Sequence, residues 1–169
     1  MKKLAIVTLS LVASPLAAQT GAVAGLGTVY NVAKGYLVKA AEQVPEETYA
    51  FKATAEVRSL GQLFGHVANA NYMFCATAMG EKSPAASDFE KTTAKAALVQ
   101  ALKDSFAYCD KAYAMADATA MQDVNLFGMK TNKLGVLSFN SAHDMEHYGN
   151  IVTYMRLKGM VPPSSQKGM

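Results

Sequence analysis

The sequence has no run of lysine or arginine residues, and it contains only three histidines and two cysteines in 169 residues. Because no basic cluster is present, nothing marks a surface for nucleic acid or for an anionic membrane, and we expect no nucleic-acid partner. Hydrophobic residues make up 51% of the chain and charged residues 17%, which is typical of a globular protein. At this length we expect one domain with a buried core.

Several catalytic motifs are also absent. There is no Gly-x-Ser-x-Gly nucleophile elbow and no phosphate-binding Gly-Lys-Ser/Thr loop. Gly25-Leu26-Gly27 does not follow a strand pattern, so it does not mark a dinucleotide site. No segment alternates polar and apolar residues over a useful length, so β-strands are not expected. The ten methionines are scattered, which favours core packing over copper binding.

The first residues have the pattern of a secretory signal peptide. Lys2 and Lys3 form a short basic segment, residues 4–16 are mostly apolar, and small residues follow at Ala17 and Ala18. The apolar segment is too short for a comfortable membrane span, so an uncleaved membrane anchor is the less favoured alternative. No cysteine lies nearby, so a lipoprotein anchor is not expected.

We predict a signal peptide over residues 1–18 and a folded domain over residues 19–169. Cleavage after Ala18 is preferred, and cleavage after Ala24 is the alternative. Removing the two lysines of the leader lowers the number of basic residues from 16 to 14, against 13 acidic residues, so the mature chain is nearly neutral. A bacterial protein with such a leader is periplasmic or secreted, and we expect no stable membrane anchor.

An exported protein folds in an oxidising compartment, where Cys75 and Cys109 could form a disulfide. We nevertheless expect two free thiols. If the cysteines lie on consecutive antiparallel helices, Cys75 is near the end of one helix and Cys109 is deep in the next. At about 1.5 Å of rise per residue their levels then differ by roughly 20 Å, which no disulfide can bridge. Both cysteines are interpreted as small buried apolar residues.

Four segments repeat apolar residues at the spacing of an amphipathic α-helix. The second has the clearest ends, because Ser59 and Gln62 form a capping-box pattern and Gly80 stops the helix. The predicted helices are 28–43, 59–79, about 92–116 and 131–158. Four long helices without a sheet predict an all-α protein, a four-helix bundle.

The pair His143 and His147 suggests a metal site. The two residues are four positions apart, so on a helix both imidazoles lie on one face. If the second and fourth helices are parallel diagonal partners, His66 lies within roughly 10 Å of the pair along the bundle axis. Three neutral imidazoles can hold one ion of zinc, nickel or copper and leave an open position. The alternative is three histidines satisfied in the core or on the surface.

Other polar residues flank the histidine pair. Asn140 and Asn150 lie near its face, and Asn69 lies in the second predicted helix, so these amides could orient ligands or hold a substrate. Asp144 and Glu146 are offset by one residue and could act as outer partners of the ligands. Surface amides and a solvated acidic edge are the simpler interpretations.

Several stretches resemble the DinB-like, or YfiT-like, family. Residues 45–51 (PEETYAF) and 56–72 (EVRSLGQLFGHVANANY) are similar to the region of the family's second helix. Residues 142–149 (AHDMEHYG) and 154–165 (YMRLKGMVPPSS) are similar to the family's last helix and tail. The resemblance extends over about residues 30–165, and the histidines, the capping box and the Pro-Pro tail recur in the same order.

This resemblance implies a four-helix bundle in which three histidines bind a divalent metal. The matching positions are His66, His143 and His147. Some relatives are thiol-dependent transferases or isomerases, others are described as metal-dependent hydrolases, and no DNA chemistry is implied. The thiol cofactors of these relatives are mainly cytosolic, so the predicted signal peptide speaks against a thiol-transferase role.

The first functional hypothesis is therefore an exported metal-dependent hydrolase that uses zinc or nickel, with Glu146 or Asp144 as candidate general bases. The alternatives are a metal-dependent thiol S-transferase or isomerase, and a non-catalytic bundle that binds a metal or another ligand. The expected substrate is a small molecule. Because the helix faces are broadly apolar, a homodimer formed through helices is also expected.

Overall fold

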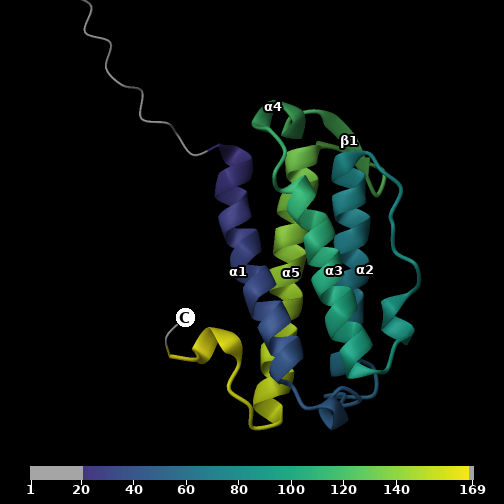
Figure 1. The fold of residues 1–169 in the computed structure, drawn as a ribbon, viewed down its shortest axis with the longest axis vertical. Helices are drawn as coiled ribbons and strands as arrows, with labels where there is room; N and C mark the ends of the chain where they lie inside the picture. Colours follow the sequence, from purple (N-terminus) through teal and green to yellow (C-terminus); the bar gives the residue numbers. More distant parts are fainter. Residues whose placement is uncertain (1–20, 168–169) are drawn as a thin grey trace, which may run out of the picture.

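The computed structural model describes residues 21–167, so the predicted signal peptide at residues 1–18 lies outside the described part of the chain. Figure 1 shows four long helices side by side, which confirms the predicted all-α four-helix bundle. The bundle helices are α1 (Ala22–Gln43), α2 (Leu60–Met79), α3 (Lys95–Ala112) and α5 (Lys133–Leu157). None of the helices within residues 21–167 has both the length and the apolar character needed to cross a bilayer.

The four helices do not simply alternate in direction (Figure 1). In this view α1 runs downward, α2 and α3 both run upward, and α5 runs downward again. α2 and α3 can be parallel because residues 80–94, the returning segment, pass back along the side of the bundle before α3 begins. α1 and α2 each pack against both α3 and α5. The expectation that the second and fourth helices are parallel diagonal partners is wrong, because α2 and α5 are antiparallel neighbours.

The parallel arrangement of α2 and α3 brings the two cysteines together. Cys75 lies fifteen residues after Leu60, and Cys109 lies fourteen residues after Lys95, so both are at the same level of the bundle. Their Cα atoms are 5.3 Å apart and their sulfur atoms form a disulfide. The prediction of two free thiols is wrong, because it assumed that consecutive helices are antiparallel.

The ends of α2 follow from its local sequence. The Ser59 hydroxyl accepts a hydrogen bond from the Gln62 backbone, and the Gln62 side chain accepts one from the Ser59 backbone, so the predicted capping box is confirmed. Gly80 ends the helix with a φ of 74°, a left-handed conformation that glycine adopts without strain. α3 is a few residues shorter at each end than predicted, and α5 matches its prediction within two residues.

α1 begins at Ala22, six residues before the predicted start at Thr28. Its cap comes from the short helix α4 (Asp117–Ala120). The Asp117 carboxylate accepts hydrogen bonds from the backbone N–H groups of Ala22, at 2.8 Å, and Val23, at 3.0 Å. A negative charge at this end of a helix is also favoured by the helix dipole. Because the capping residue is distant in sequence, the local pattern of α1 could not reveal this start.

A short β-hairpin precedes α5, so the expectation of no strands is wrong. β1 (Asp123–Leu126) pairs antiparallel with β2 (Met129–Asn132), with Leu126 opposite Met129. Phe127 and Gly128 form the two-residue turn, and their φ angles are 53° and 83°. Two positive φ angles are what a type I′ turn requires. Each strand has only four residues, which is too short for an alternating pattern to be recognised.

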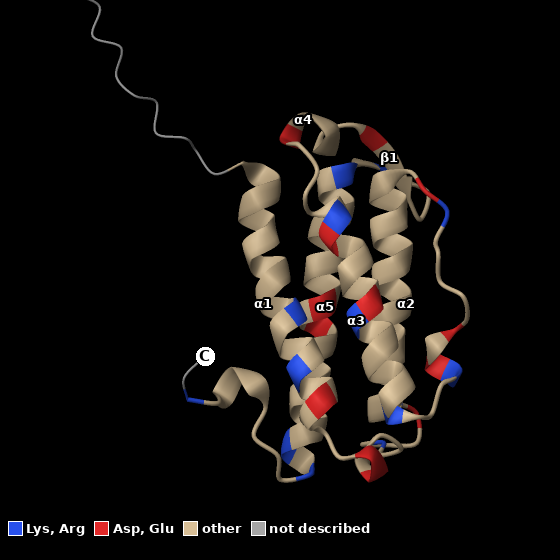
Figure 2. Ribbon diagram, in the orientation of Figure 1, with Lys and Arg blue, Asp and Glu red and all other residues tan. Residues whose placement is uncertain are grey.

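Apolar side chains from all four long helices fill the core. The fully buried large ones include Tyr30, Leu37, Phe64, Phe74, Leu102, Phe106, Ile151 and Met155. Short 3-10 helices lie in the connections and the tail: η1 (Glu46–Thr48), η2 (Phe89–Lys91) and η3 (Pro163–Ser165). Figure 2 shows charged residues of both signs scattered over the bundle, whereas the first half of α1 carries none.

Candidate metal centre

Three histidines meet between α2 and α5. His66 lies six residues after Leu60 in α2, and His143 and His147 lie on successive turns of α5. The Nε2 atoms of His66 and His143 are 3.2 Å apart, and those of His147 and His143 are 3.1 Å apart. One ligand atom from each of the three residues lies within 4.8 Å of the other two. The three imidazoles therefore direct their Nε2 atoms toward one shared volume.

A shared ion accounts for these short nitrogen–nitrogen distances better than hydrogen bonds do. An imidazole Nε2 carries either one hydrogen or one lone pair, so His143 Nε2 cannot make both contacts as good hydrogen bonds. Two nitrogens bound at about 2.05 Å to one ion lie about 2.9 Å apart at a right angle and about 3.3 Å apart at a tetrahedral angle. The observed 3.1 and 3.2 Å lie between these values. The three histidines could therefore hold a divalent metal ion.

The surroundings of the two α5 histidines favour the neutral imidazole, which is the form that binds metal. Burial, together with the smaller effects of the neighbouring His147 and His66, lowers the pKa of His143 to about 4. Burial, followed by the effect of His66, also lowers the pKa of His147. At neutral pH both side chains therefore retain a lone pair for a ligand bond.

A carboxylate from outside the helix pair fixes the orientation of His66. Glu90, in η2, accepts a hydrogen bond from His66 Nδ1 at 2.7 Å and another from Arg58 Nε at 2.8 Å. Burial tends to raise the pKa of Glu90, but the hydrogen bonds from Arg58 and His66 outweigh it and hold that pKa below its usual value. Because an ionised carboxylate can only accept, the proton of His66 stays on Nδ1 and the Nε2 lone pair faces the site. Outer carboxylates of this kind are typical of metal-binding histidines.

Close packing of the returning segment on α2 positions Glu90. The Asn69 side chain donates to Asp88 Oδ1 at 2.8 Å and accepts from the Phe89 backbone N–H at 3.1 Å. Gly65 allows this approach, because a Cβ atom at that position would collide with the Phe89 carbonyl. The amide predicted to hold a ligand, Asn69, thus holds the segment that carries Glu90.

Neither Arg58 nor Glu90 is marked by a sequence motif. Both lie in connections without helical periodicity, and their contacts join segments that are far apart in the chain. The one local pattern near Glu90 is the preceding Asp88, which accepts a hydrogen bond from the Glu90 backbone N–H at 3.1 Å. That pattern is common to many turns, so it carries no information about metal binding.

The two acidic residues beside the histidine pair have different environments. Asp144 is fully buried, and its Oδ1 has no hydrogen-bond partner within the described chain. Its other oxygen accepts a hydrogen bond from the Asn140 amide at 3.4 Å. Burial raises the pKa of Asp144 well above its usual value, so this residue does not provide a solvent-accessible base. Glu146 is exposed on α5.

The remaining predicted amides also differ. The Asn150 amide lies 3.5 Å from His147 Nδ1, at the outer limit of a hydrogen bond. Asn140 is buried and donates to the Tyr113 hydroxyl at 3.3 Å, away from the histidine rings. His143 Nδ1 is buried and has no partner among residues 21–167. Asn150 is therefore the amide of the three that reaches a histidine.

A pocket of about 380 Å³ borders the histidines. The Phe74 ring packs against the His143 ring with centroids 5.5 Å apart, so the pocket and the histidine cluster share a wall. The lining residues are His66, Asn69, Ala70, Met73, Phe74, Glu90, Phe127, Phe139 and His143. A substrate held in this pocket would lie directly beside the metal position.

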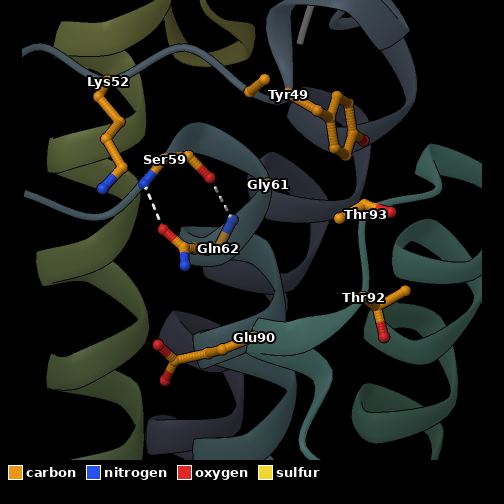
Figure 3. Close-up of a pocket in the computed structure, with 9 residues that line it drawn as sticks. Tyr49, Lys52, Ser59, Gly61, Gln62, Glu90, Thr92 and Thr93 are labelled. Atoms are coloured by element: carbon orange, nitrogen blue, oxygen red, sulfur yellow. Dashed lines mark hydrogen bonds between the residues drawn. The ribbon is translucent and has the colours of Figure 1, made fainter.

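A second pocket, of about 290 Å³, borders Glu90 at the start of α2 (Figure 3). It is lined in part by Tyr49, Lys52, Ser59, Gln62, Thr92 and Thr93. The first N–H groups of α2 are already occupied by the capping box and by the bond from Gly61 N–H to the Tyr49 carbonyl at 2.8 Å. Figure 3 shows the Glu90 carboxylate pointing away from Thr92 and Thr93. This pocket therefore has no open helix N-terminus for an anion.

The fold and the site together define a four-helix bundle with a three-histidine cluster that could hold a metal ion. The chain belongs to the DinB superfamily, whose sequence model matches residues 31–151. This finding confirms the family resemblance seen in the sequence.

Two solved structures have a similar fold. A DinB-like protein from Bacillus cereus has a TM-score of 0.73 and 15% identity, with 82% of this chain and 94% of that chain covered. A DinB-like protein from Bacillus subtilis has a TM-score of 0.65 and 18% identity, with 86% and 99% covered. At these identities the likeness shows the fold alone. No curated protein matches the chain.

Proposed function

We propose that this protein is an exported metal-dependent hydrolase that holds one zinc or nickel ion between His66, His143 and His147. The observation that carries the proposal is the convergence of the three Nε2 atoms at spacings that suit a shared ion. The hydrogen bond between His66 and Glu90 supports it further, because it supplies the outer carboxylate typical of metal-binding histidines.

Each side chain of the site has a defined role. When bound, a divalent ion held by three neutral histidines supplies Lewis-acid chemistry, because it polarises a carbonyl or phosphoryl oxygen and makes water ionise near neutral pH. Glu90 keeps the proton of His66 on Nδ1, and Arg58 balances the charge of Glu90. Phe74 covers one side of the His143 ring and excludes water there.

The disulfide between Cys75 and Cys109 supports export. Disulfides persist in oxidising compartments and are rare in the cytosol, where thiols are kept reduced. A periplasmic or secreted location agrees with the predicted signal peptide at residues 1–18. It also favours hydrolysis over thiol transfer, since the thiol cofactors of the transferase relatives are mainly cytosolic.

Metal analysis of histidine variants tests the ligand set. The parent protein should bind one zinc or nickel ion, each of His66→Ala, His143→Ala and His147→Ala should bind it much more weakly, and any double variant should lose stoichiometric binding. Helical circular dichroism should be retained, because the bundle buries its own apolar faces. If His66→Ala and His143→Ala each still bind one ion tightly, the three histidines are not the metal ligands, and the proposed enzyme function fails as well.

Two glutamate-to-glutamine variants, one at Glu90 and one at a control position, test the role of the hydrogen bond between Glu90 and His66. Glu90→Gln should weaken metal binding by about 10- to 100-fold, as is typical when the outer partner of a ligand is lost. Glu47→Gln, which changes an exposed carboxylate of η1, should leave metal affinity unchanged. Equal affinities for the two variants would contradict the role of Glu90.

Activity assays then decide the reaction class. Metal-loaded protein should hydrolyse members of a panel of esters, amides and phosphate esters, and His143→Ala should not. Turnover seen only with a thiol co-substrate would identify a transferase or isomerase instead. Metal binding without turnover of either panel would identify a non-catalytic binding bundle. Both of these outcomes contradict the hydrolase proposal.

A further inference from the structure

The pocket beside the histidines has an aromatic wall built from three different elements. Phe74 comes from α2, Phe127 from the hairpin turn and Phe139 from α5. The Phe74 ring centroid lies 5.9 Å from that of Phe127 and 5.2 Å from that of Phe139, and the latter two rings are 6.3 Å apart. Centroid distances of this size are those of interacting aromatic rings. The Phe74 ring also contacts His143, so the aromatic wall continues to the metal position.

A phenylalanine at position 127 is energetically unfavourable for two reasons. Its φ of 53° places it in the left-handed region, where asparagine and glycine are at ease and a bulky side chain is not. Phe127 as a whole is also 61% exposed, so folding alone gains little from burying its side chain. Strained residues of this kind are held in place by the surrounding structure, and they cluster at active sites and ligand sites. The hairpin thus holds an aromatic ring at the mouth of the pocket.

The polar side chains of the pocket are already engaged. Asn69 is bonded to Asp88 and to the Phe89 backbone. Glu90 is bonded to His66 and Arg58. A sugar or a nucleotide would need several free donors and acceptors, because each buried hydroxyl or phosphate must be satisfied. The open interactions are therefore the aromatic wall and the position between the histidines.

We propose that this pocket binds an aromatic or similarly compact apolar group of a small substrate, with an adjoining carbonyl or carboxylate oxygen at the metal position. Phe127 is then a specificity-determining residue that covers the apolar group from the hairpin side. The substrate class is aryl or arylalkyl esters and amides. This inference rests on the proposed metal-dependent function, and it adds the substrate class.

Two hydroxamates that differ in their apolar group test the inference. Benzohydroxamate and acetohydroxamate have the same metal-binding head, and calorimetry on zinc-loaded protein measures both affinities. Replacing the methyl group by a ring that enters the pocket should tighten binding at least about tenfold. Equal affinities would overturn the proposal.

The variant Phe127→Asn isolates the ring of the hairpin turn. Asparagine suits the left-handed conformation before Gly128, so thermal stability should be unchanged or higher. Benzohydroxamate should bind about two- to tenfold more weakly, as expected for loss of one aromatic contact, and acetohydroxamate should be unaffected. Met129→Ala removes an exposed side chain of the same hairpin that does not line the pocket, and it should change neither affinity.

Separate measurements distinguish failure of the pocket from failure of the metal site. If zinc titration shows no binding, the proposed function fails, and the pocket is tested with 4-fluorobenzyl alcohol by fluorine NMR on metal-free protein. Binding of that probe that weakens in Phe127→Asn retains the apolar site. If Phe127→Asn binds both benzohydroxamate and the fluorinated probe as tightly as the parent protein does, the assignment of Phe127 is overturned. If this variant changes the oligomeric mass and leaves the selectivity between the two hydroxamates unchanged, the ring belongs to an interface between two copies. That result would also overturn the proposal.

Discussion

Removing the disulfide between Cys75 and Cys109 should lower stability substantially. The bond closes a loop with a sequence separation of 34 residues. The chain-entropy relation for a loop of that length gives a contribution of about 3.8 kcal/mol, which comes mainly from restricting the unfolded chain. For a domain of this size each 1 kcal/mol corresponds to about 2–4 °C in melting temperature, so the expected decrease is about 8–15 °C.

The assay is thermal unfolding followed by circular dichroism, with and without reductant. The parent protein should melt at a lower temperature when reduced, and the double variant Cys75→Ala/Cys109→Ala should melt near the reduced parent. Adding reductant to the double variant should change nothing, which controls for effects of the reductant itself. Thiol counting on the denatured, unreduced parent should find no free thiol.

Two results would refute the reasoning. Two free thiols in the unreduced parent would mean that the disulfide is absent, and its contribution to stability would be absent with it. A melting temperature that falls by less than about 2 °C on reduction would mean that the bond restricts the unfolded chain far less than the loop length requires.

Three further predictions concern the metal site, processing and assembly. Bound metal should be released by acid, because each histidine must be deprotonated to bind. Burial lowers the pKa of His143 to about 4, so protons compete less well with the metal for this side chain. The midpoint of metal release, measured as metal content against pH, should therefore lie below about 6.5, the ordinary histidine pKa. A midpoint above that value would contradict the prediction. Intact mass of natively produced protein should place the N-terminus at Gln19, because a start at Gly25 would remove the helix turn capped by Asp117. Light scattering at micromolar concentration should give the mass of a dimer, and Val32→Glu, at an exposed position in the uncharged first half of α1, should lower that mass. A monomeric mass for the parent protein would reject the dimer.

Local sequence patterns predicted much of the fold. The capping box at Ser59 and the glycine at position 80 lie within α2's own sequence, so its ends could be placed from residues that are neighbours in the chain. The start of α1 could not be placed in this way, because the carboxylate that caps it belongs to Asp117, which is distant in the sequence. The hairpin was missed because four-residue strands give too little alternation, and its Phe127-Gly128 turn lacks the usual asparagine.

The meeting of the three histidines was predicted through a partly wrong argument. His143 and His147 share a helix face whatever the topology. His66 was placed near them by assuming parallel diagonal helices, whereas α2 and α5 are antiparallel neighbours. It still meets them because it lies in the lower part of α2, and the middle of α5, which carries His143 and His147, passes that level. Metal binding by these residues stays a prediction.

Glu90 could not be found from the sequence, because its role depends on the path of the returning segment. A connection that turned α3 antiparallel to α2 would place Glu90 far from His66 and would separate the cysteines. The same error in topology therefore concealed both the outer carboxylate and the disulfide. Neither depends on periodicity, and both depend on a chain path set by contacts such as the close approach of Phe89 to Gly65.

The order of the helices also determines how this chain can fold. α1 and α2 lie on opposite sides of the bundle, α2 and α3 are parallel, and α3 and α5 again lie opposite each other. No pair of consecutive long helices in the described chain can therefore close as a two-helix hairpin. Native packing requires contacts between distant segments, and folding rates fall as the sequence separation of contacts rises. This chain should fold more slowly than an up-and-down bundle of the same length, and in an oxidising compartment Cys75 must remain unpaired until the returning segment and α3 are in place.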